Sequence, residues 1–310
     1  MATFTTFTEE ALVRYLTMFR LGELTSFEAI EEGIENSNYF VSIDLHGVNT
    51  DYVLSIIEQL DLNDLPFFNQ VLQHLFYYGL PVPAPKPTLD GMTTTLFCGK
   101  PTLLFPRLEG VHLEDVDETH CRAIGNALGD IHVTLATQDW YRANPYSPEW
   151  METTLVDISS KVSADDLTMV NQITNDYETA QELSLPAGIV HGDLFRDNVL
   201  FENNEVSGIL DFFHACNDFF VQDIAITIND WCREDATNIS ETRRTALIEG
   251  YSKKRELTEM ELEHLPAFQT FSAARFALTR LISGDQGEYL KDPDEFLDLT
   301  RELVRQSQGS

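Results

Sequence analysis

The sequence predicts an α+β fold in two parts, a β-rich N-terminal lobe of residues 1–105 and a mainly helical C-terminal lobe of residues 106–310. Three observations predict it. Strand-like patterns dominate before Pro106, helical apolar spacing dominates after it, and the second part contains one short hairpin pattern. No long linker separates the parts, so we expect a hinge near Pro106.

The N-terminal lobe is expected to consist mainly of strands, with one helix at its start and another between the strands. Thr8 precedes two glutamates and then apolar residues at helical spacing, which is typical of a helix N-terminus. A second helix is predicted within 63–79, with Asp64 as its N-cap and Gly79 as its stop signal. The strand-like segments are 26–33, 37–44, 50–57 and two within 93–108 around a Gly99-Lys100 turn.

The C-terminal lobe is expected to be mostly helical. A long helix is predicted to begin at Asp117, because apolar residues follow it at helical spacing. Further helices are expected over 164–183 and 258–283, and strands over 188–190, 198–202 and 206–210. The "ENNEVSG" segment joins the last two strands, which predicts a hairpin.

The composition limits the partners of the chain. Twenty Lys and Arg stand against 51 Asp and Glu, a formal net charge of −31, which disfavours nucleic acid and anionic membranes as partners. The four cysteines are far apart and form no C-x-x-C, so neither a disulfide framework nor a structural zinc site is expected. No apolar run of roughly 18 residues and no signal-peptide pattern occurs. We therefore expect a cytoplasmic protein, of unknown oligomeric state.

Polar residues gather in "GIVHGDLFRDNVLF", residues 188–201. Asn198 follows Asp193 by five residues, and Asp211 lies 13 residues later, at the end of the predicted hairpin. Because the outer ends of hairpin strands meet, Asn198 and Asp211 are expected to converge. Amide and carboxylate oxygens suit magnesium, and Asp193 beside them could orient a hydroxyl or accept its proton. These groups predict phosphoryl transfer from a nucleotide.

The spacing of these residues resembles a kinase catalytic loop. His191, Asp193 and Asn198 fit H-x-D-x-x-x-x-N, and Asp211 fits the second aspartate after the hairpin. The alternative is an ordinary polar turn before a hairpin. The other protein-kinase motifs are missing: there is no G-x-G-x-x-G, no A-P-E, and Asp211 is followed by two phenylalanines instead of Phe-Gly.

This combination resembles the aminoglycoside phosphotransferase and choline kinase superfamily, and within it the bacterial homoserine kinase family. The similar segments run almost from end to end. They are "EGIENSNYFV" (32–41), "DLPFFNQVLQHL" (64–75), "GLPVPAP" (79–85), "VHGDLFRDNVLF" (190–201), "GILDFFHACNDFFVQDIAITINDWC" (208–232), "AARFALTRL" (273–281) and "KDPDEF" (291–296).

The resemblance implies a two-lobed, protein-kinase-like fold with ATP in its cleft, near the segment 103–110 that contains Arg107. It implies that the side-chain hydroxyl of L-homoserine is phosphorylated to O-phospho-L-homoserine, a step toward threonine. By the motif match, Asp193 is the catalytic carboxylate, and Asn198 and Asp211 hold Mg²⁺.

The chain departs from many kinase-like enzymes at the lysine that holds the nucleotide phosphates. Only six lysines occur, the first of them Lys86, so we expect the small lobe not to supply this residue. Backbone N–H groups of a bend, an arginine or magnesium would take its place. The candidate cofactor-binding residues of that bend are Gly33, Asn36, Ser37 and Asn38. The alternative is an ordinary polar β-turn.

Several further residues are candidates for the acceptor site or its support. Arg275, on a largely apolar helix, could bind a carboxylate of the acceptor, or could pair with one of the many acids. His214 and Asn217 could line the acceptor pocket or simply fill a loop. His191 is expected to brace the loop, and Asp223 to brace it or cap a helix.

Two alternative functions remain open. The acceptor could be another small amino alcohol, such as choline, ethanolamine, hydroxylysine or an aminoglycoside, since an acidic surface suits cations. A catalytically inactive pseudokinase that only binds nucleotide is the alternative from a different class.

Overall fold

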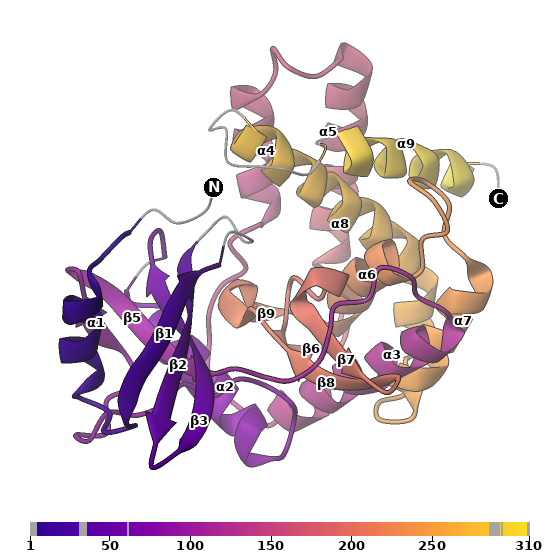
Figure 1. The fold of residues 1–310 in the computed structure, drawn as a ribbon. Helices are drawn as coiled ribbons and strands as arrows, with labels where there is room; N and C mark the ends of the chain where they lie inside the picture. Colours follow the sequence, from indigo (N-terminus) through magenta and orange to yellow (C-terminus); the bar gives the residue numbers. More distant parts are fainter. Residues whose placement is uncertain (1–4, 31–35, 61, 285–291, 293, 309–310) are drawn as a thin grey trace. The chain divides into compact units, whose positions relative to one another are not determined.

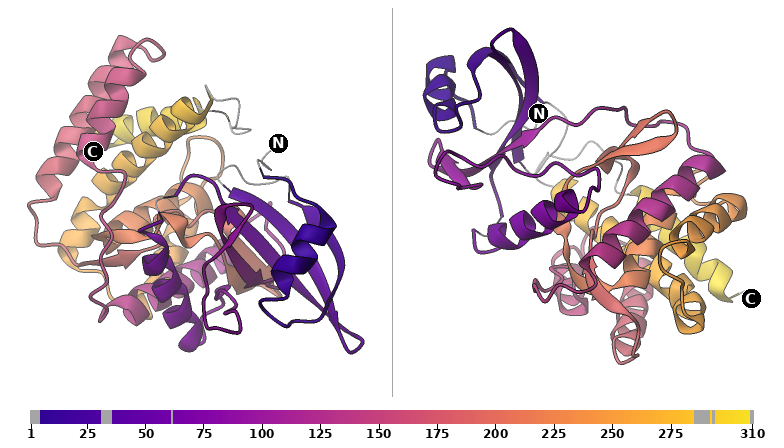
Figure 2. Two further views of the ribbon diagram at one scale, coloured as in Figure 1. Left: turned by 90° about the vertical axis from the view of Figure 1, so that its left-hand side faces the viewer. Right: turned by 90° about the horizontal axis from the view of Figure 1, so that it is seen from below.

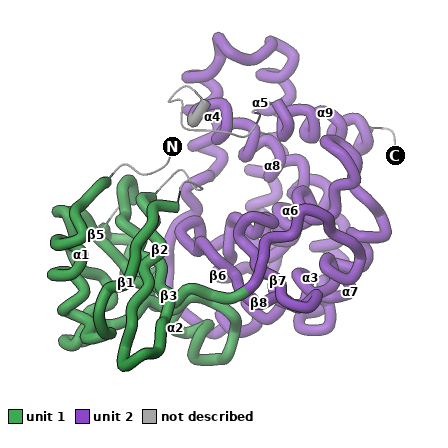
Figure 3. The backbone as a smooth tube through the Cα atoms, in the orientation of Figure 1, with its two compact units in different colours: residues 1–109 green, residues 110–310 purple. Residues whose placement is uncertain are grey.

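The structure is a computed structural model, and it describes residues 5–30, 36–60, 62–284, 292 and 294–308. Contacts within the chain divide it into two compact units, residues 1–109 and residues 110–310 (Figure 3). The first unit is built around a β-sheet and the second mainly from helices (Figure 1). The predicted α+β class is thereby confirmed.

The sheet of the first unit has five antiparallel strands in the order β1-β2-β3-β5-β4. The elements of this unit are α1 (Glu9–Leu16), β1 (Glu23–Ala29), β2 (Asn36–Leu45), β3 (Val48–Ile57), α2 (Leu65–Tyr77), β4 (Thr95–Phe97) and β5 (Lys100–Pro106). Each predicted strand and helix of this lobe is present, with shifted ends. The largest shift concerns β1, which is predicted over 26–33 and ends at Ala29.

The core of this unit lies between α1 and one face of the sheet. Leu12 and Leu16 of α1 pack with Val41 of β2 and Leu54 of β3, all nearly or fully buried. Period-two burial along β2 explains this, because every second side chain of a strand points to the same face. The helix lies beside the sheet in all three views (Figures 1 and 2).

Besides the turn at His46 and Gly47 between β2 and β3, two tight hairpin turns have the geometry that a twisted hairpin favours. Cys98 and Gly99 join β4 to β5 with φ of 53° and 77°. Asn203 and Asn204 join the hairpin of the second unit with φ of 51° and 65°. Positive φ at both central residues matches the right-handed twist of the flanking strands. The first turn therefore lies one residue before the predicted Gly99-Lys100 turn, and Lys100 begins β5.

The second unit contains helices and two small antiparallel ladders. Its elements are α3 (Glu118–Leu135), α4 (Pro148–Asp157), α5 (Ala164–Ala180), β6 (Ala187–Val190), β7 (Val199–Glu202), β8 (Glu205–Ile209), β9 (Cys216–Phe219), α6 (Phe220–Trp231), α7 (Glu241–Ser252), α8 (Glu259–Gly284) and α9 (Asp294–Gln308). The predicted hairpin β7–β8 is confirmed. The four-residue strand β9, which pairs with β6, is absent from the prediction.

Helix α6 lies at the centre of the second unit. All of its 12 residues are buried, including Asp223 and Asp230. It packs against α3, α8 and strand β6. Buried acids on such a helix need hydrogen-bond partners, and both find them in the loop after β6.

Helices α3 and α7 pack unusually close together. A Cβ atom on Gly125 would lie 2.1 Å from the carbonyl oxygen of Leu247, and one on Gly250 would lie 2.1 Å from that of Arg122. Glycine at both positions therefore allows backbone-to-backbone contact. None of the described helices is long and apolar enough to span a membrane.

Candidate active site

The site is built on the loop between β6 and β7, residues 191–198. A short 3₁₀ turn, Arg196–Asn198, ends the loop, and β7 begins at Val199. Side chains from α6 form hydrogen bonds with four backbone groups of the loop and so fix its conformation.

Asp223 holds the first part of the loop. Its carboxylate accepts hydrogen bonds from the backbone N–H groups of His191 at 2.7 Å and Gly192 at 2.9 Å. It also accepts one from Nε2 of His132 at 3.1 Å. Burial acts to raise the pKa of Asp223, but these hydrogen bonds outweigh it and lower the pKa. The carboxylate therefore stays charged inside the unit.

His191 is fully buried and acts as a second internal support. Its Nε2–H donates to the carbonyl oxygen of Leu210 at 2.9 Å, and its Nδ1 accepts from the backbone N–H of Asp193 at 3.2 Å. Burial lowers the pKa of His191 to about 4, so the ring is neutral near pH 7. A ring with both nitrogens occupied in this way holds the loop against β8 and the residues after it.

Gly192 allows the loop to approach the segment after Asp211. Its φ is +79°, and a Cβ atom there would lie 2.8 Å from the carbonyl oxygen of His214. Any other residue would be strained and would collide with this backbone. The two chain segments that carry Asp193 and Asp211 therefore touch.

Asp193 and Asn198 form a direct pair. The amide nitrogen of Asn198 donates to the carboxylate of Asp193 at 3.0 Å and to its carbonyl oxygen at 2.8 Å. This places the amide oxygen of Asn198 on the other side of the amide group. The pair fixes the orientation of the Asp193 carboxylate relative to the 3₁₀ turn.

Asp211 follows the hairpin directly. The backbone N–H of Leu210 donates to the carbonyl oxygen of Asn198 at 2.8 Å, so the hairpin ladder continues to Asn198 and Asp211 is the next residue. Asp211 is exposed and has left-handed backbone angles, φ 55° and ψ 65°. No group of three or more His, Cys, Asp or Glu among the described residues is placed to hold a metal ion. A metal here would depend on few protein ligands.

Two further residues of α6 hold the rear of the loop. The carboxylate of Asp230 accepts from the backbone N–H of Arg196 at 2.7 Å, and Nε1 of Trp231 donates to the carbonyl oxygen of Leu194 at 3.0 Å. Asp230 lies seven residues after Asp223, two helical turns along the same face. One helix face thus holds the loop at both ends.

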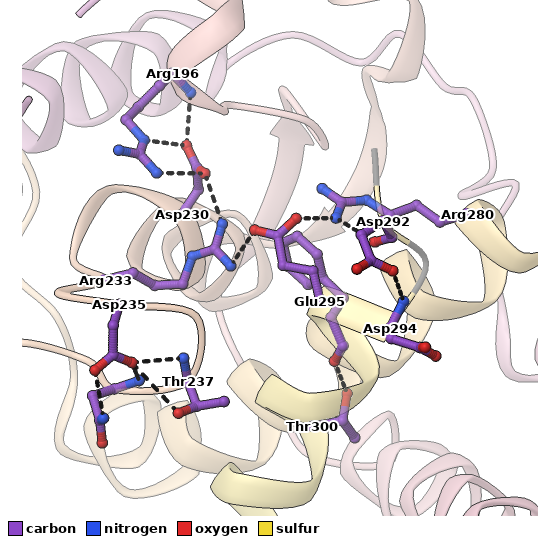
Figure 4. A network of polar contacts seen from close by, with 12 residues as sticks. Arg196, Asp230, Arg233, Asp235, Thr237, Arg280, Asp292, Asp294, Glu295 and Thr300 are labelled. Carbon is purple, nitrogen blue, oxygen red and sulfur yellow. Dashed lines mark hydrogen bonds and ion pairs between the residues drawn. The ribbon is translucent and has the colours of Figure 1, made fainter. Parts of the chain in front are cut away.

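Asp230 is the start of a chain of ion pairs (Figure 4). It pairs with Arg196 at 3.3 Å and with Arg233 at 3.5 Å. Glu295 of α9 then accepts from Arg233 at 2.6 Å and from Arg280 of α8 at 2.5 Å. The loop is therefore tied through α6 to α8 and α9.

The acceptor candidates lie in different surroundings. Arg275 of α8 is 3 % exposed, and its guanidinium carbon lies 3.6 Å from the ring centre of Tyr146. The hydroxyl of Tyr146 is hydrogen-bonded to Nδ1 of His214 at 3.3 Å, which brings His214 to the same place. Asn217 accepts from the backbone N–H of Arg142 at 2.9 Å, so its amide oxygen supports a neighbouring segment. The ligand-binding roles of these residues stay predictions.

The predicted phosphate-facing bend is placed differently by the structure. Gly33 lies outside the described residues, and Asn36, Ser37 and Asn38 belong to β2, so their placement in the bend is wrong. Ser37 is fully buried, and its hydroxyl donates to Glu58 at 2.6 Å. Asn38 accepts from the hydroxyl of Ser55 at 2.6 Å. These polar side chains form hydrogen bonds within the sheet, and the sequence pattern does not indicate their partners.

The first unit contains a lysine held in an ion pair, whereas the sequence predicts that the small lobe supplies none for the nucleotide phosphates; that expectation stays a prediction. Lys100, at the start of β5, forms an ion pair with Glu58, which follows the last residue of β3. Its Nζ also donates to the hydroxyl of Thr5 at 2.8 Å. Lys100 reaches Glu58 because β5 pairs with β3 and therefore lies beside it. Arg107, in contrast, packs over the ring of Phe40 at 4.0 Å.

The chain is similar in sequence to known proteins along most of its length. Residues 26–257 match the phosphotransferase enzyme family. The chain belongs to this family. It is 38 % identical over 306 residues to a homoserine kinase of Agrobacterium fabrum, covering 96 % of this chain and 94 % of that protein. A homoserine kinase of Pseudomonas aeruginosa is 35 % identical over 302 residues, with 96 % and 94 % covered.

Solved structures of low sequence identity share the fold. The amicoumacin kinase hAmiN superposes with a TM-score of 0.71 at 18 % identity, covering 98 % of this chain and 94 % of that chain. The choline kinase LicA of Streptococcus pneumoniae gives a TM-score of 0.70 at 14 % identity, with 97 % and 99 % covered. The predicted kinase-like, aminoglycoside phosphotransferase-like fold is therefore confirmed.

Some residues that shape the site escaped the sequence analysis. Asp230 and Trp231 could have been found, because Asp230 lies one heptad after Asp223 on an apolar helix. Lys100 and Tyr146 carry no such signal, since only the folded chain brings them to Glu58 and Arg275.

Proposed function

We propose that the protein transfers the γ-phosphoryl group of ATP to the side-chain hydroxyl of L-homoserine, giving O-phospho-L-homoserine, in the cytoplasm. The observation that carries the proposal is the Asp193–Asn198 pair, held on a braced loop that touches the segment after Asp211. The near-complete coverage of relatives named homoserine kinase supports the choice of acceptor.

Asp193 would position the acceptor hydroxyl and accept its proton. Its carboxylate is half-buried and oriented by the amide of Asn198, while neutral His191 supports its backbone. Fixing the carboxylate before the substrate arrives reduces the entropy lost in reaching the transition state. Because His191 has both ring nitrogens occupied, Asp193 is the better candidate for the proton acceptor.

Asn198 and Asp211 fit a magnesium ion. The amide nitrogen of Asn198 is engaged by Asp193, which leaves its oxygen for a metal, and Asp211 offers a carboxylate on an exposed, left-handed residue. Both are hard oxygen ligands, and Mg²⁺ usually completes its shell with water and phosphate oxygens. When bound, the ion would offset negative charge on the transferred phosphoryl group.

Residues of the first unit would bind the nucleotide. We propose that Lys100, paired with Glu58, supplies the cation that contacts the phosphates, since its side chain is 39 % exposed while that of Glu58 is 6 % exposed. The backbone around Gly33 and Arg107 are further candidates. The buried glutamate holds the lysine side chain in a fixed direction.

A panel assay tests the proposal. ADP release is measured with MgATP and, separately, L-homoserine, choline, ethanolamine, hydroxylysine and an aminoglycoside. We expect the highest kcat/KM with L-homoserine and no turnover without Mg²⁺. A higher kcat/KM with another alcohol would identify that alcohol as the acceptor instead of L-homoserine. ATP binding without turnover on any alcohol would indicate a pseudokinase.

A further inference from the structure

Arg275 is a buried cation without an anionic partner in the described chain. It is 3 % exposed, and none of the described residues accepts a hydrogen bond from its Nη1 atom. Its guanidinium carbon lies 3.6 Å from the ring centre of Tyr146 and 3.9 Å from that of Phe276. Two aromatic rings thus cover the guanidinium, and only its edge remains to bind a ligand.

This lack of a partner is unusual in a chain with 51 acids and 20 basic residues. Arg280, on the same helix and equally buried at 3 % exposure, pairs with Glu295 at 2.5 Å. A buried charge that lacks a partner destabilises the fold, so such a group is expected where a ligand supplies the counter-charge. A planar guanidinium edge matches a carboxylate with two parallel hydrogen bonds.

Arg275 is connected to the catalytic loop by direct contacts. The hydroxyl of Tyr146, which covers its guanidinium, is hydrogen-bonded to Nδ1 of His214 at 3.3 Å. The backbone of His214 in turn lies against Gly192, the residue before Asp193. These contacts connect Arg275 to the loop that carries Asp193.

Asp218 of β9 is hydrogen-bonded to the segment that carries Tyr146. The side chain of Asn144 donates to Asp218 at 2.6 Å and accepts from the backbone N–H of Tyr146 at 2.8 Å. The hydroxyl of Tyr177 also donates to Asp218, at 3.2 Å. Burial raises the pKa of Asp218 to about 6. The carboxylate also accepts from the backbone N–H of Phe219 at 2.7 Å, so both of its oxygens have hydrogen-bond partners, whereas Nη1 of Arg275 has none among the described residues.

We propose that Arg275 binds the α-carboxylate of an amino-acid acceptor. The inference rests on the proposed function and adds the group that selects for the carboxylate. It explains how a site in an acidic protein can accept a molecule with a carboxylate. An acceptor that lacks the carboxylate would leave the buried Arg275 without a partner, and the site would therefore reject it.

The test compares acceptors that each lack one charge. The kcat/KM values are measured for L-homoserine, for 3-aminopropan-1-ol, which lacks the carboxylate, and for 4-hydroxybutanoate, which lacks the ammonium group. In Arg275→Met, the ratio of homoserine to 3-aminopropan-1-ol should fall about 100-fold. In the same variant, the ratio of homoserine to 4-hydroxybutanoate should stay within about twofold, because both acceptors keep the carboxylate.

Two variants control for effects on folding. Arg280→Met removes an equally buried arginine of α8 that already has a partner, and should leave both ratios unchanged. Arg275→Lys keeps the charge and should retain more of the ratio than Arg275→Met. Equal losses on all three acceptors in Arg275→Met would overturn the inference while leaving the proposed function intact. Absence of homoserine phosphorylation by the unmodified protein would instead refute the proposed function.

Discussion

At the scale of single residues, the site depends on which groups are charged and which are held. His191 stays neutral because it is buried, whereas Asp223 stays ionised because two backbone amides and His132 donate to it. Asp193 is oriented by Asn198. The motif could be read from the sequence, but the assignment of hydrogen-bond partners required the folded chain.

Asp193→Asn should lower kcat by about 10³-fold, because an amide cannot accept the hydroxyl proton. The urea midpoint should change little, since the side chain is only half-buried. Steady-state kinetics and urea unfolding check both expectations. Asp197→Asn is the matched control, because Asp197 is exposed in the same loop and has no proposed catalytic role. Near-full activity of Asp193→Asn would rule out its assigned role.

Lys100→Met should raise the KM for ATP about tenfold, which corresponds to roughly 1.4 kcal/mol. The KM for L-homoserine should change little, because Lys100 is proposed to contact only the nucleotide. Lys86→Met is the control within the same unit. An unchanged KM for ATP, together with lower stability, would indicate that the Lys100–Glu58 pair serves only the fold.

At the scale of elements, α6 connects the fold to the loop. Its apolar composition predicts a buried helix, and the sequence predicts that Asp223 braces the catalytic loop or caps a helix. The second support, from Asp230 to Arg196, was missed because a sequence pattern does not show which loop a helix face meets. Strand β9 is absent from the prediction for a similar reason, since its four residues pair with the equally short β6.

Asp230→Asn tests whether α6 positions the loop. The substitution keeps the size of the side chain but removes the charge that holds Arg196 and Arg233. We expect kcat to fall about tenfold, with both KM values within about twofold, because a misplaced loop weakens the transition state more than binding. Asp235→Asn, in the following exposed loop, is the control. Loss of stability with unchanged kcat would limit Asp230 to a structural role.

At the scale of the whole molecule, the sequence predicted the two-part α+β organisation and most helices and strands. It failed where distant segments meet, as in the pairing of Lys100 with Glu58 and the covering of Arg275 by Tyr146. Such contacts depend on tertiary packing rather than on local spacing. The formal net charge of −31 affects the whole molecule as well, since lowering the pH relieves repulsion among the acids.

The pH dependence of stability separates this general effect from the buried histidine. The pKa of His191 is about 4 in the folded protein, below its ordinary value of 6.5, so the unfolded chain binds a proton first as the pH falls. Its stabilising contribution is complete above pH 6.5 and is lost progressively toward pH 4. Asp218, with its pKa raised to about 6, has the opposite sign.

We therefore compare slopes between variants. Between pH 7 and pH 5, the free energy of unfolding of His191→Gln should fall by about 2 kcal/mol less than that of the unmodified protein. Urea unfolding at pH 7 and at pH 5 gives the free energy of unfolding of the two proteins. Parallel pH dependence in the two proteins would contradict a neutral, buried His191.

The central claim is that this chain phosphorylates the hydroxyl of L-homoserine through Asp193. The most direct test follows a reaction of MgATP and L-homoserine by ³¹P NMR, with the unmodified protein and with Asp193→Asn. We predict one equivalent of ADP for each equivalent of a new phosphomonoester identified as O-phospho-L-homoserine, and almost none with the variant. ADP formed with inorganic phosphate alone, or the same phosphomonoester yield from Asp193→Asn, would contradict the claim.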